Sequence, residues 1–353
     1  MRLNTLKFIF ILLPFLAVCQ NKEIERSLSF GFSFGKVLIH SKSIENIGTS
    51  NPKSISLNYY WRKTDIESYN KYSGLPALST SLQYIDFQNN ILQKGVIGSY
   101  SIHPSLLHSK IFEIDTRVGM GIAYLKNPYQ SDNQAYSSPI STFLALGINS
   151  KFNISKKFQI CLTGGINHIS NGGLKLPNKG INWLESQFQL NYFISQKTDY
   201  KYFTNKYSNS KYNKTNFWKL YLFASSKNLI TKPNQNKPIL GIHLQYSHQV
   251  GRSNSLLYGI EHFLDYAQLV DNPLTSNNFH KTGLLIGHEF LWGSIHFNQQ
   301  IGIYLHATPK GLSSWYHRWG LDYHCSNHII LGVNLLAHGV VAYFPDLRIG
   351  FTF

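Results

Sequence analysis

Apolar residues alternate with polar or small residues in one segment after another of this chain. Near the start, the polar or small positions 29, 31 and 33 separate Leu28, Phe30, Phe32 and Phe34. Much later, His243 and Gln245 separate Ile242, Leu244 and Tyr246. A repeat of two residues places alternate side chains on opposite faces of a β-strand, whereas a helix repeats about every 3.6 residues. The chain is therefore predicted to be all-β.

The composition indicates that the apolar faces of these strands meet lipid. Aromatic residues make up 14% of the chain and charged residues only 14%, against about 25% charged residues in typical soluble domains. Beyond the N-terminal segment, no window of about 18 residues is apolar and free of charge, as a membrane-spanning helix requires. We therefore predict an antiparallel transmembrane β-barrel of the bacterial outer membrane.

Residues 1–20 have the features of a signal peptide. Arg2 and Lys7 precede an apolar run from Phe8 to Val18, which is the pattern of a secretory signal. Cleavage near this point is favoured over lipidation of Cys19, because Val18 is bulky for the residue before a lipidated cysteine. The mature chain is expected to be exported and to begin near residue 21.

The number of alternating segments predicts about 12–16 strands. About eight lie before residue 196 and six to eight after residue 217, and the last of them ends on the C-terminal Phe353, which resembles the C-terminal signal of bacterial outer-membrane barrels. Residues 196–217 form a polar connection that contains five lysines. Residues 218–353 could widen one closed barrel or form a second, tethered barrel. One barrel is favoured, because added strands extend a closed sheet without leaving an edge.

A histidine and a serine stand two residues apart at the end of one predicted strand. Residues 158–170 are the seventh segment, so this strand runs outward if the N-terminus is periplasmic. Its even positions are apolar and must face lipid, and His168 and Ser170 continue that set. Their side chains therefore project from the same face and can share a hydrogen bond. On the following strand, counting back by twos from the apolar face puts Asn182 on the same outer side.

These three residue types can hydrolyse an ester. A serine is inert at its free pKa and needs a base such as His168 to take its proton during attack on a carbonyl. The imidazole needs a third group to hold one tautomer, and a neutral Asn182 can do so, as in Cys-His-Asn proteases. Glu185 is the nearest acid, but it is at an odd-numbered position of its strand, so its side chain is expected to point into the lumen. We therefore expect Ser170, His168 and Asn182 to be the catalytic residues.

A glycine-rich turn follows the serine and could stabilise an oxyanion. Asn171, Gly172, Gly173 and Asn178 are the candidates, because backbone N–H groups in such a turn are free of side-chain obstruction. Each glycine alone is more simply a turn residue. A histidine and a serine alone are likewise more simply polar residues at the headgroup level. The whole set from residue 168 to residue 182 is what favours a catalytic interpretation.

At these residues the chain resembles the lipid A 3-O-deacylase family, outer-membrane esterases with eight strands that are also called PagL-like or acyloxyacyl hydrolases. The family's His-x-Ser-Asn pattern falls on His168, Ser170 and Asn171, and its Pro-Asn-x-Gly pattern falls on Pro177, Asn178 and Gly180. The resemblance covers about residues 27–195 and implies that residues 21–195 are a catalytic half. It implies hydrolysis of a fatty-acyl ester of lipid A, without an organic cofactor, and we expect no metal site.

Asn182 departs from this resemblance, since the best-known deacylases carry a glutamate there. The outer-membrane phospholipase A family has an asparagine as its orienting residue, and its His-x-Ser-Asn-Gly pattern falls on residues 168–172 together with Asn182. That family is a calcium-assisted dimer. Its resemblance implies a phospholipid substrate, calcium and a homodimer as the alternative to lipid A. A non-catalytic barrel, such as a porin or an adhesion scaffold, is the third possibility.

The net charge and the cysteines add weaker expectations. The formal charge of +16 suits an anionic partner, which for an exported barrel is lipopolysaccharide phosphate or anionic lipid before nucleic acid. A general bias toward lysine in the proteome would give the same charge. Beyond the signal peptide only Cys161 and Cys325 remain, too few for a disulfide framework and without the spacing of a metal site. Both are expected to be small strand residues.

Overall fold

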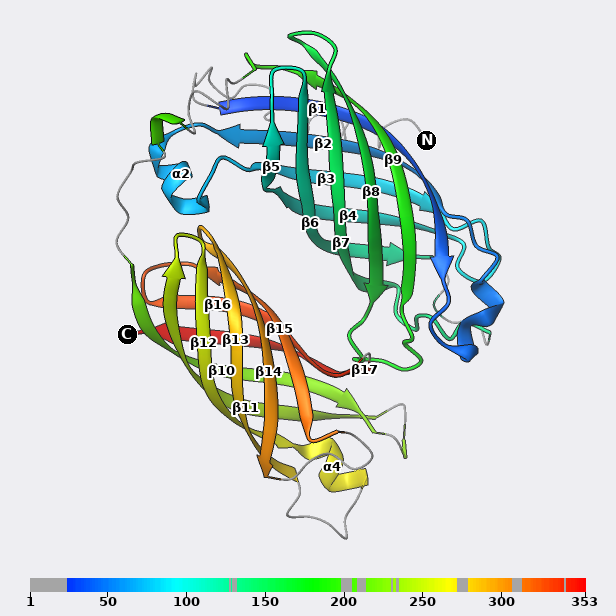
Figure 1. Cartoon of the computed structure of the whole chain (residues 1–353). Helices are drawn as coiled ribbons and strands as arrows, with labels where there is room; N and C mark the ends of the chain where they lie inside the picture. The colour runs from blue at the N-terminus through cyan, green and yellow to red at the C-terminus, as the bar shows by residue number, and fades with distance from the viewer. Residues whose placement is uncertain are drawn as a thin grey trace, which may run out of the picture.

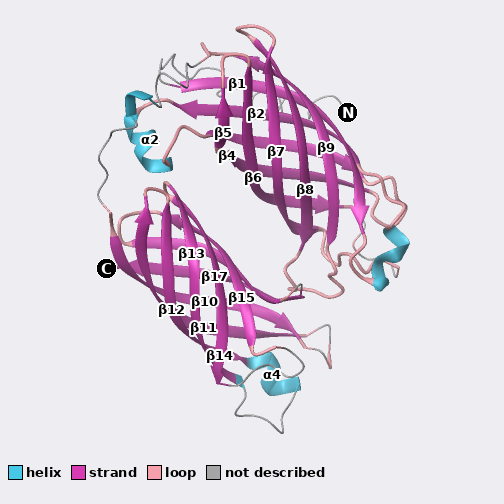
Figure 2. Ribbon diagram, in the orientation of Figure 1, coloured by secondary structure: helices cyan, strands magenta, loops and turns pink. Residues whose placement is uncertain are grey.

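The computed structural model describes residues 24–126, 128, 132–197, 205–207, 214–229, 231–232, 235–271, 279–306, 313–339 and 341–353. The signal peptide predicted for residues 1–20 lies outside the described residues, as does much of the polar connection after residue 197. Most of the described chain forms antiparallel strands, and the short helices lie at the ends of these strands (Figures 1 and 2).

The first half of the chain closes into one barrel. Its spanning strands are β1 (Ile24–Leu38), β2 (Lys53–Lys63), β3 (Ala77–Asp86), β4 (Lys94–His103), β6 (Phe112–Leu125), β7 (Ile140–Asn153), β8 (Phe158–Ser170) and β9 (Ile181–Phe193). The short strand β5 (Ser105–His108) continues β4 beyond Pro104, and both pair with β6. Because β9 pairs with β1, the barrel has eight strands around it, and we call it barrel 1.

The second half closes into a separate barrel, which we call barrel 2. Its eight strands are β10 (Asn216–Asn228), β11 (Asn236–Gly251), β12 (Asn254–Asp265), β13 (His280–Trp292), β14 (Ile295–His306), β15 (Trp315–His324), β16 (Ile329–His338) and β17 (Val341–Thr352). β17 closes the barrel by pairing with β10. The C-terminal Phe353 continues this pairing, since its backbone N–H and C=O both bond to Trp218.

The expectation of one wide barrel is therefore wrong, whereas the expected number of strands is confirmed. The sequence predicted about eight strands before residue 196 and six to eight after residue 217, and the structure has eight spanning strands in each half. The halves do not merge because β9 returns to β1 and β17 returns to β10. Each set of described strands thereby leaves no unpaired edge strand. The two barrels lie next to each other (Figure 1).

The connections between the strands distinguish the two ends of the barrels. In barrel 2, the turns 252–253 and 293–294 are short, whereas α4 (Tyr266–Asp271) begins a longer connection at the opposite end. In barrel 1, the 3-10 helix η2 (Lys42–Ile47) lies at the same end as α4. The helix α2 (Ile66–Tyr72) lies at the other end, where barrel 2 has its short turns. Long connections are typical of the outer side of such barrels, so β8 runs outward as expected. None of the helices in the described part of the chain is long and apolar enough to cross a membrane.

The strands have apolar outer faces and polar inner faces, as the alternation predicted. On β8, Leu162 and Ile166 are exposed on the outside, while Thr163 and Asn167 are buried in the lumen. A barrel of eight strands has an interior just wide enough to be filled by side chains. Neither barrel therefore has the wide polar lumen that a porin needs.

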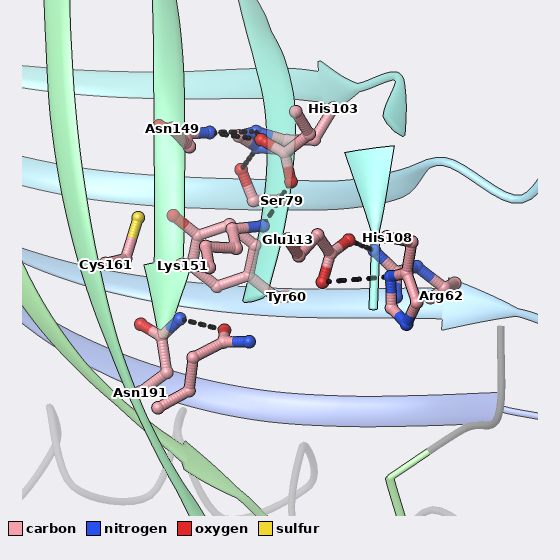
Figure 3. Close-up of polar contacts among 12 residues, drawn as sticks. Tyr60, Arg62, Ser79, His103, His108, Glu113, Asn149, Lys151, Cys161 and Asn191 are labelled. Atoms are coloured by element: carbon pink, nitrogen blue, oxygen red, sulfur yellow. Dashed lines mark hydrogen bonds and ion pairs between the residues drawn. The ribbon is translucent and has the colours of Figure 1, made fainter. Parts of the chain in front are cut away.

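Paired charges occupy the lumen of barrel 1 (Figure 3). Arg62 forms an ion pair with Glu113 and lies 3.5 Å from Glu25, and Lys151 forms an ion pair with Asp115. All five side chains are buried, and a buried charge without a partner is strongly destabilising. The charged side chains on the inner face of the strands thus pair with each other inside the barrel.

An apolar cluster fills the outward part of the lumen of barrel 1. Ile169 of β8 and Ile181 and Trp183 of β9 are members of this cluster, and each is at most 1% exposed. These residues alternate with His168, Ser170 and Asn182, whose side chains lie on the other face of the same strands. The close packing of the cluster therefore holds the backbone that carries the predicted catalytic residues.

The two cysteines differ from each other in position. Cys161 is buried in β8, as expected of a small strand residue, but Cys325 is exposed in the turn 325–328 after β15, so the strand expectation is wrong there. Both are free thiols.

Candidate active site

Ser170, His168 and Asn182 form one chain of hydrogen bonds on the outer face of barrel 1. The Oγ atom of Ser170 lies 2.9 Å from Nε2 of His168, and Nδ1 of His168 lies 2.5 Å from Oδ1 of Asn182. Because the amide oxygen can only accept, Nδ1 of His168 carries the proton and Nε2 is free to accept from the serine hydroxyl. This is the tautomer that a general base requires.

The pairing of β8 with β9 places the three residues together. His168 and Asn182 are direct cross-strand partners, so their side chains stand next to each other on one face. Ser170 follows His168 by two residues and therefore shares that face. All three side chains are half-buried. The sequence argument from parity predicted this proximity.

Glu185 lies on the opposite face, as its parity predicted. It is buried in the lumen, where its carboxylate forms an ion pair of 2.7 Å with Arg117. Its side chain therefore points away from His168, and Asn182 is the group that contacts the imidazole.

His40 joins the site, and the sequence argument missed it. This residue follows β1, and its Nδ1 atom lies 3.1 Å from Nδ2 of Asn182. Its Nε2 atom lies 2.8 Å from the backbone oxygen of Lys179. His40 is 128 positions before His168 in the chain, and it lies just beyond the end of a strand. Its proximity follows only from the pairing of β1 with β9, in which Leu38 lies opposite Asn182.

Residues 171–180, the β8–β9 loop, contain the four oxyanion candidates. The backbone N–H of Asn171 donates to Oδ1 of Asn178 at 3.1 Å, and that of Gly173 donates to Oδ1 of Asn171 at 2.9 Å. Two of the candidate donors are thus used within the loop itself. Among the described residues, the N–H of Gly172 and the Nδ2 group of Asn178 have no hydrogen-bond partner.

Gly180 is required by both its backbone and its surroundings. Its φ is +77°, a left-handed conformation that side chains other than glycine rarely adopt. A Cβ atom there would lie 2.8 Å from Cε1 of His168 and 3.2 Å from the backbone oxygen of Ile169. The glycine of the Pro-Asn-x-Gly pattern thus leaves room for the imidazole.

The β8–β9 loop also contacts barrel 2. The backbone N–H of Leu176 donates to Oδ1 of Asn228 at 3.1 Å, where Asn228 is the last residue of β10. Gly172 packs against Pro345 of β17, since a Cβ on Gly172 would lie 3.0 Å from Cγ of Pro345. A second set of contacts joins the inward ends, where Arg252 donates to Asn70 at 2.8 Å. The two barrels therefore touch at both ends.

The described residues contain no group of three or more histidine, cysteine, aspartate or glutamate side chains arranged to hold a metal ion. The polar groups around Ser170 are an imidazole pair, amides and backbone N–H groups. These groups suit proton transfer and the stabilisation of a developing negative charge on oxygen.

Comparison with protein families assigns both halves of the chain. Residues 53–191 match the model of lipid A 3-O-deacylase (PagL), and residues 216–353 match the model of the acyloxyacyl hydrolase C-terminal domain. The chain belongs to the lipid A 3-O-deacylase family. This deacylase is an outer-membrane β-barrel enzyme that hydrolyses an acyl ester of lipid A. The resemblance inferred from the motif is confirmed, and the match to the second model extends it to the second barrel.

Comparisons with single proteins add little for this deacylase. No curated protein matches the chain. Among solved structures, the outer membrane enzyme PagL is 14% identical, with 46% of this chain and 97% of that chain covered and a TM-score of 0.31. A mutant porin of Rh. blastica is 9% identical, with 94% and 100% covered and a TM-score of 0.22. Structural matches with TM-scores this low support no conclusion about the site.

Proposed function

We propose that Ser170 is the nucleophile of the deacylase and His168 its general base. The observation that carries the proposal is the unbroken chain from Ser170 Oγ through His168 to Asn182, with contacts of 2.9 and 2.5 Å. As Oγ attacks the ester carbonyl of the lipid, Nε2 of His168 takes its proton and then gives it to the departing alkoxide of the sugar. Water then attacks the acyl-serine with His168 as base, which releases the fatty acid and restores the serine.

Asn182 has the role of an orienting residue in this proposal. Its Oδ1 atom accepts from Nδ1 of His168, which keeps Nε2 as the acceptor that faces Ser170. When His168 becomes an imidazolium during the reaction, a neutral amide stabilises it less than a carboxylate would.

The oxyanion is stabilised by the β8–β9 loop. The N–H of Gly172 and the Nδ2 group of Asn178 are the donors that the loop leaves unused, while Asn171 and Gly173 hold the loop in shape. Donors that are fixed before the reaction stabilise the transition state without reorganisation. Asn171 and Gly173 are then supporting residues, and Gly172 and Asn178 contact the oxyanion.

The position of the site suits a substrate that stays in the membrane. Ser170 lies at the outward end of β8, on the face whose other members, such as Ile166 and Leu162, are exposed and apolar. An acyl chain embedded in the outer leaflet could therefore reach the serine from the lipid side. The net positive charge of the chain favours a substrate with phosphate groups, such as lipid A.

We propose that lipid A is preferred over phospholipid and that no metal ion is required. The purified protein should be incubated in detergent with lipopolysaccharide or with phospholipid, each with EDTA or with added calcium, and the released fatty acids measured. Release from lipopolysaccharide that is unchanged by EDTA is the expected result. Release only from phospholipid, or only with calcium, would favour the phospholipase alternative and a calcium-assisted dimer. No release from either lipid would contradict the enzymatic proposal.

A further inference from the structure

The hydrogen bonds of His40 continue the chain of the proposed catalytic residues by one more member. Its Nε2 atom lies 2.8 Å from the backbone oxygen of Lys179. A carbonyl oxygen only accepts, so Nε2 carries the proton of the neutral ring, and Nδ1 is an acceptor. Nδ1 then accepts from Nδ2 of Asn182 at 3.1 Å. The longer approach of Nδ1 to the backbone oxygen of Leu38, at 3.4 Å, is between two acceptors in this tautomer.

An asparagine side chain needs such a partner to act as an orienting residue. Its amide has an acceptor at one end and a donor at the other, and a half-turn about its last bond exchanges them. In the reversed orientation, Nδ2 of Asn182 would face the proton on Nδ1 of His168, and the catalytic tautomer would be lost. A carboxylate presents an acceptor at either end and has no wrong orientation.

We propose that His40 is a positioning residue that keeps Oδ1 of Asn182 directed toward His168. This inference rests on the proposed roles of Ser170, His168 and Asn182. It names a residue outside the motif, and it explains how a neutral amide can serve as the orienting group. His40 does not contact the serine or the ester, so it acts on the reaction only through Asn182.

A double-mutant cycle tests the role of His40. In the otherwise unchanged chain, His40→Ala should lower kcat about tenfold, the effect of one lost hydrogen bond, with little change in KM. In an Asn182→Asp background, the same substitution should lower kcat less than about threefold, because an aspartate has no amide to orient. An equal loss in both backgrounds would mean that His40 is merely structural and would overturn the proposal.

A conservative variant of His40 gives a second measurement, which does not require the Asn182→Asp substitution. His40→Asn places an amide oxygen close to the position of Nδ1 and should keep kcat within about threefold of the unchanged protein. A loss as large as that of His40→Ala would contradict the proposal. If His40→Ala leaves kcat unchanged while Ser170→Ala abolishes activity, the positioning role fails and the proposed catalytic roles stand. If Ser170→Ala has no effect, the proposed function itself fails.

A different observation concerns barrel 2, whose contacts with the β8–β9 loop lie next to the proposed oxyanion donors. Asn228 is buried, accepts from the backbone N–H of Leu176 and donates to Asn236. Pro345 packs against Gly172, which is two residues after Ser170. Two residues span at most about 7 Å of chain, so barrel 2 reaches almost to the nucleophile.

We infer that barrel 2 is a positioning element for the catalytic loop and that it acts through Asn228. Asn228→Ala removes the bonds to Leu176 and to Asn236, whereas Asn236→Ala removes only the second of them. We expect Asn228→Ala to lower kcat on lipid A about three- to tenfold and Asn236→Ala to leave kcat unchanged, with the two variants equally stable to heat. Equal kcat values for the two variants would overturn this inference.

Discussion

Replacing Ser170 by alanine should lower the rate of lipid A hydrolysis by about 10³-fold or more, because loss of the nucleophile removes the covalent route altogether. His168→Ala should have an effect of similar size, and the double variant should be little worse than either single one, since the two residues act as a unit. The fatty acids released from lipopolysaccharide by purified protein measure these rates.

Ser186 offers a matched control for this substitution. It is an exposed serine on the same outer face, on the neighbouring strand β9, and it has no histidine as its cross-strand partner, since it pairs with Gly164. Ser186→Ala should keep full activity. Residual hydrolysis by Ser170→Ala within about tenfold of the unchanged protein would rule out a serine mechanism.

Replacing Arg318 by methionine should destabilise barrel 2 by about 3–5 kcal/mol, the cost of breaking a buried ion pair from one side. The guanidinium lies 2.8 Å from Glu261 and 2.7 Å from Asp346, and all three side chains are fully buried. Arg348 remains beside Asp346 at 2.8 Å, so Glu261 is the carboxylate left without a positive partner. Thermal unfolding, followed by the difference in gel mobility between heated and unheated protein, measures the loss.

A second substitution separates charge from packing in this prediction. Adding Glu261→Gln to Arg318→Met removes the unpaired negative charge and should restore part of the lost stability, because an amide costs less to bury than a carboxylate. If the double variant is less stable than Arg318→Met alone, the loss comes from packing around the guanidinium and not from the unpaired charge.

Much of the site could be predicted because it is local. His168 and Ser170 belong to one strand, and Asn182 lies on the next, so the period of two and a short loop were enough to place all three on one face. The same period of two correctly predicted that the side chain of Glu185 points into the lumen, where it pairs with Arg117. The strand count and the outward direction of β8 followed from the same periodicity.

Other parts of the site could not be predicted, because they depend on pairings between distant segments. His40 approaches Asn182 only because β1 pairs with β9, and no pattern near residue 40 marks it. The roles of Asn171 and Asn178 within the β8–β9 loop depend on side-chain orientation, which spacing does not determine. The contact of Leu176 with Asn228 joins two separate barrels, so it depends on how the barrels pack against each other.

The amino-acid pattern alone was enough to predict that this chain forms outer-membrane strands, which of their faces meet lipid, and which histidine and serine share a face at the outward end. These properties follow from the two-residue period of a strand, which each segment carries on its own. The pairing of strands far apart in the chain was needed to see that the sixteen spanning strands of the described residues close as two barrels of eight, and that His40 and barrel 2 lie at the site. Alternation gives the same faces whichever strand becomes the neighbour, so closure is decided by the hydrogen bonds between β9 and β1 and between β17 and β10.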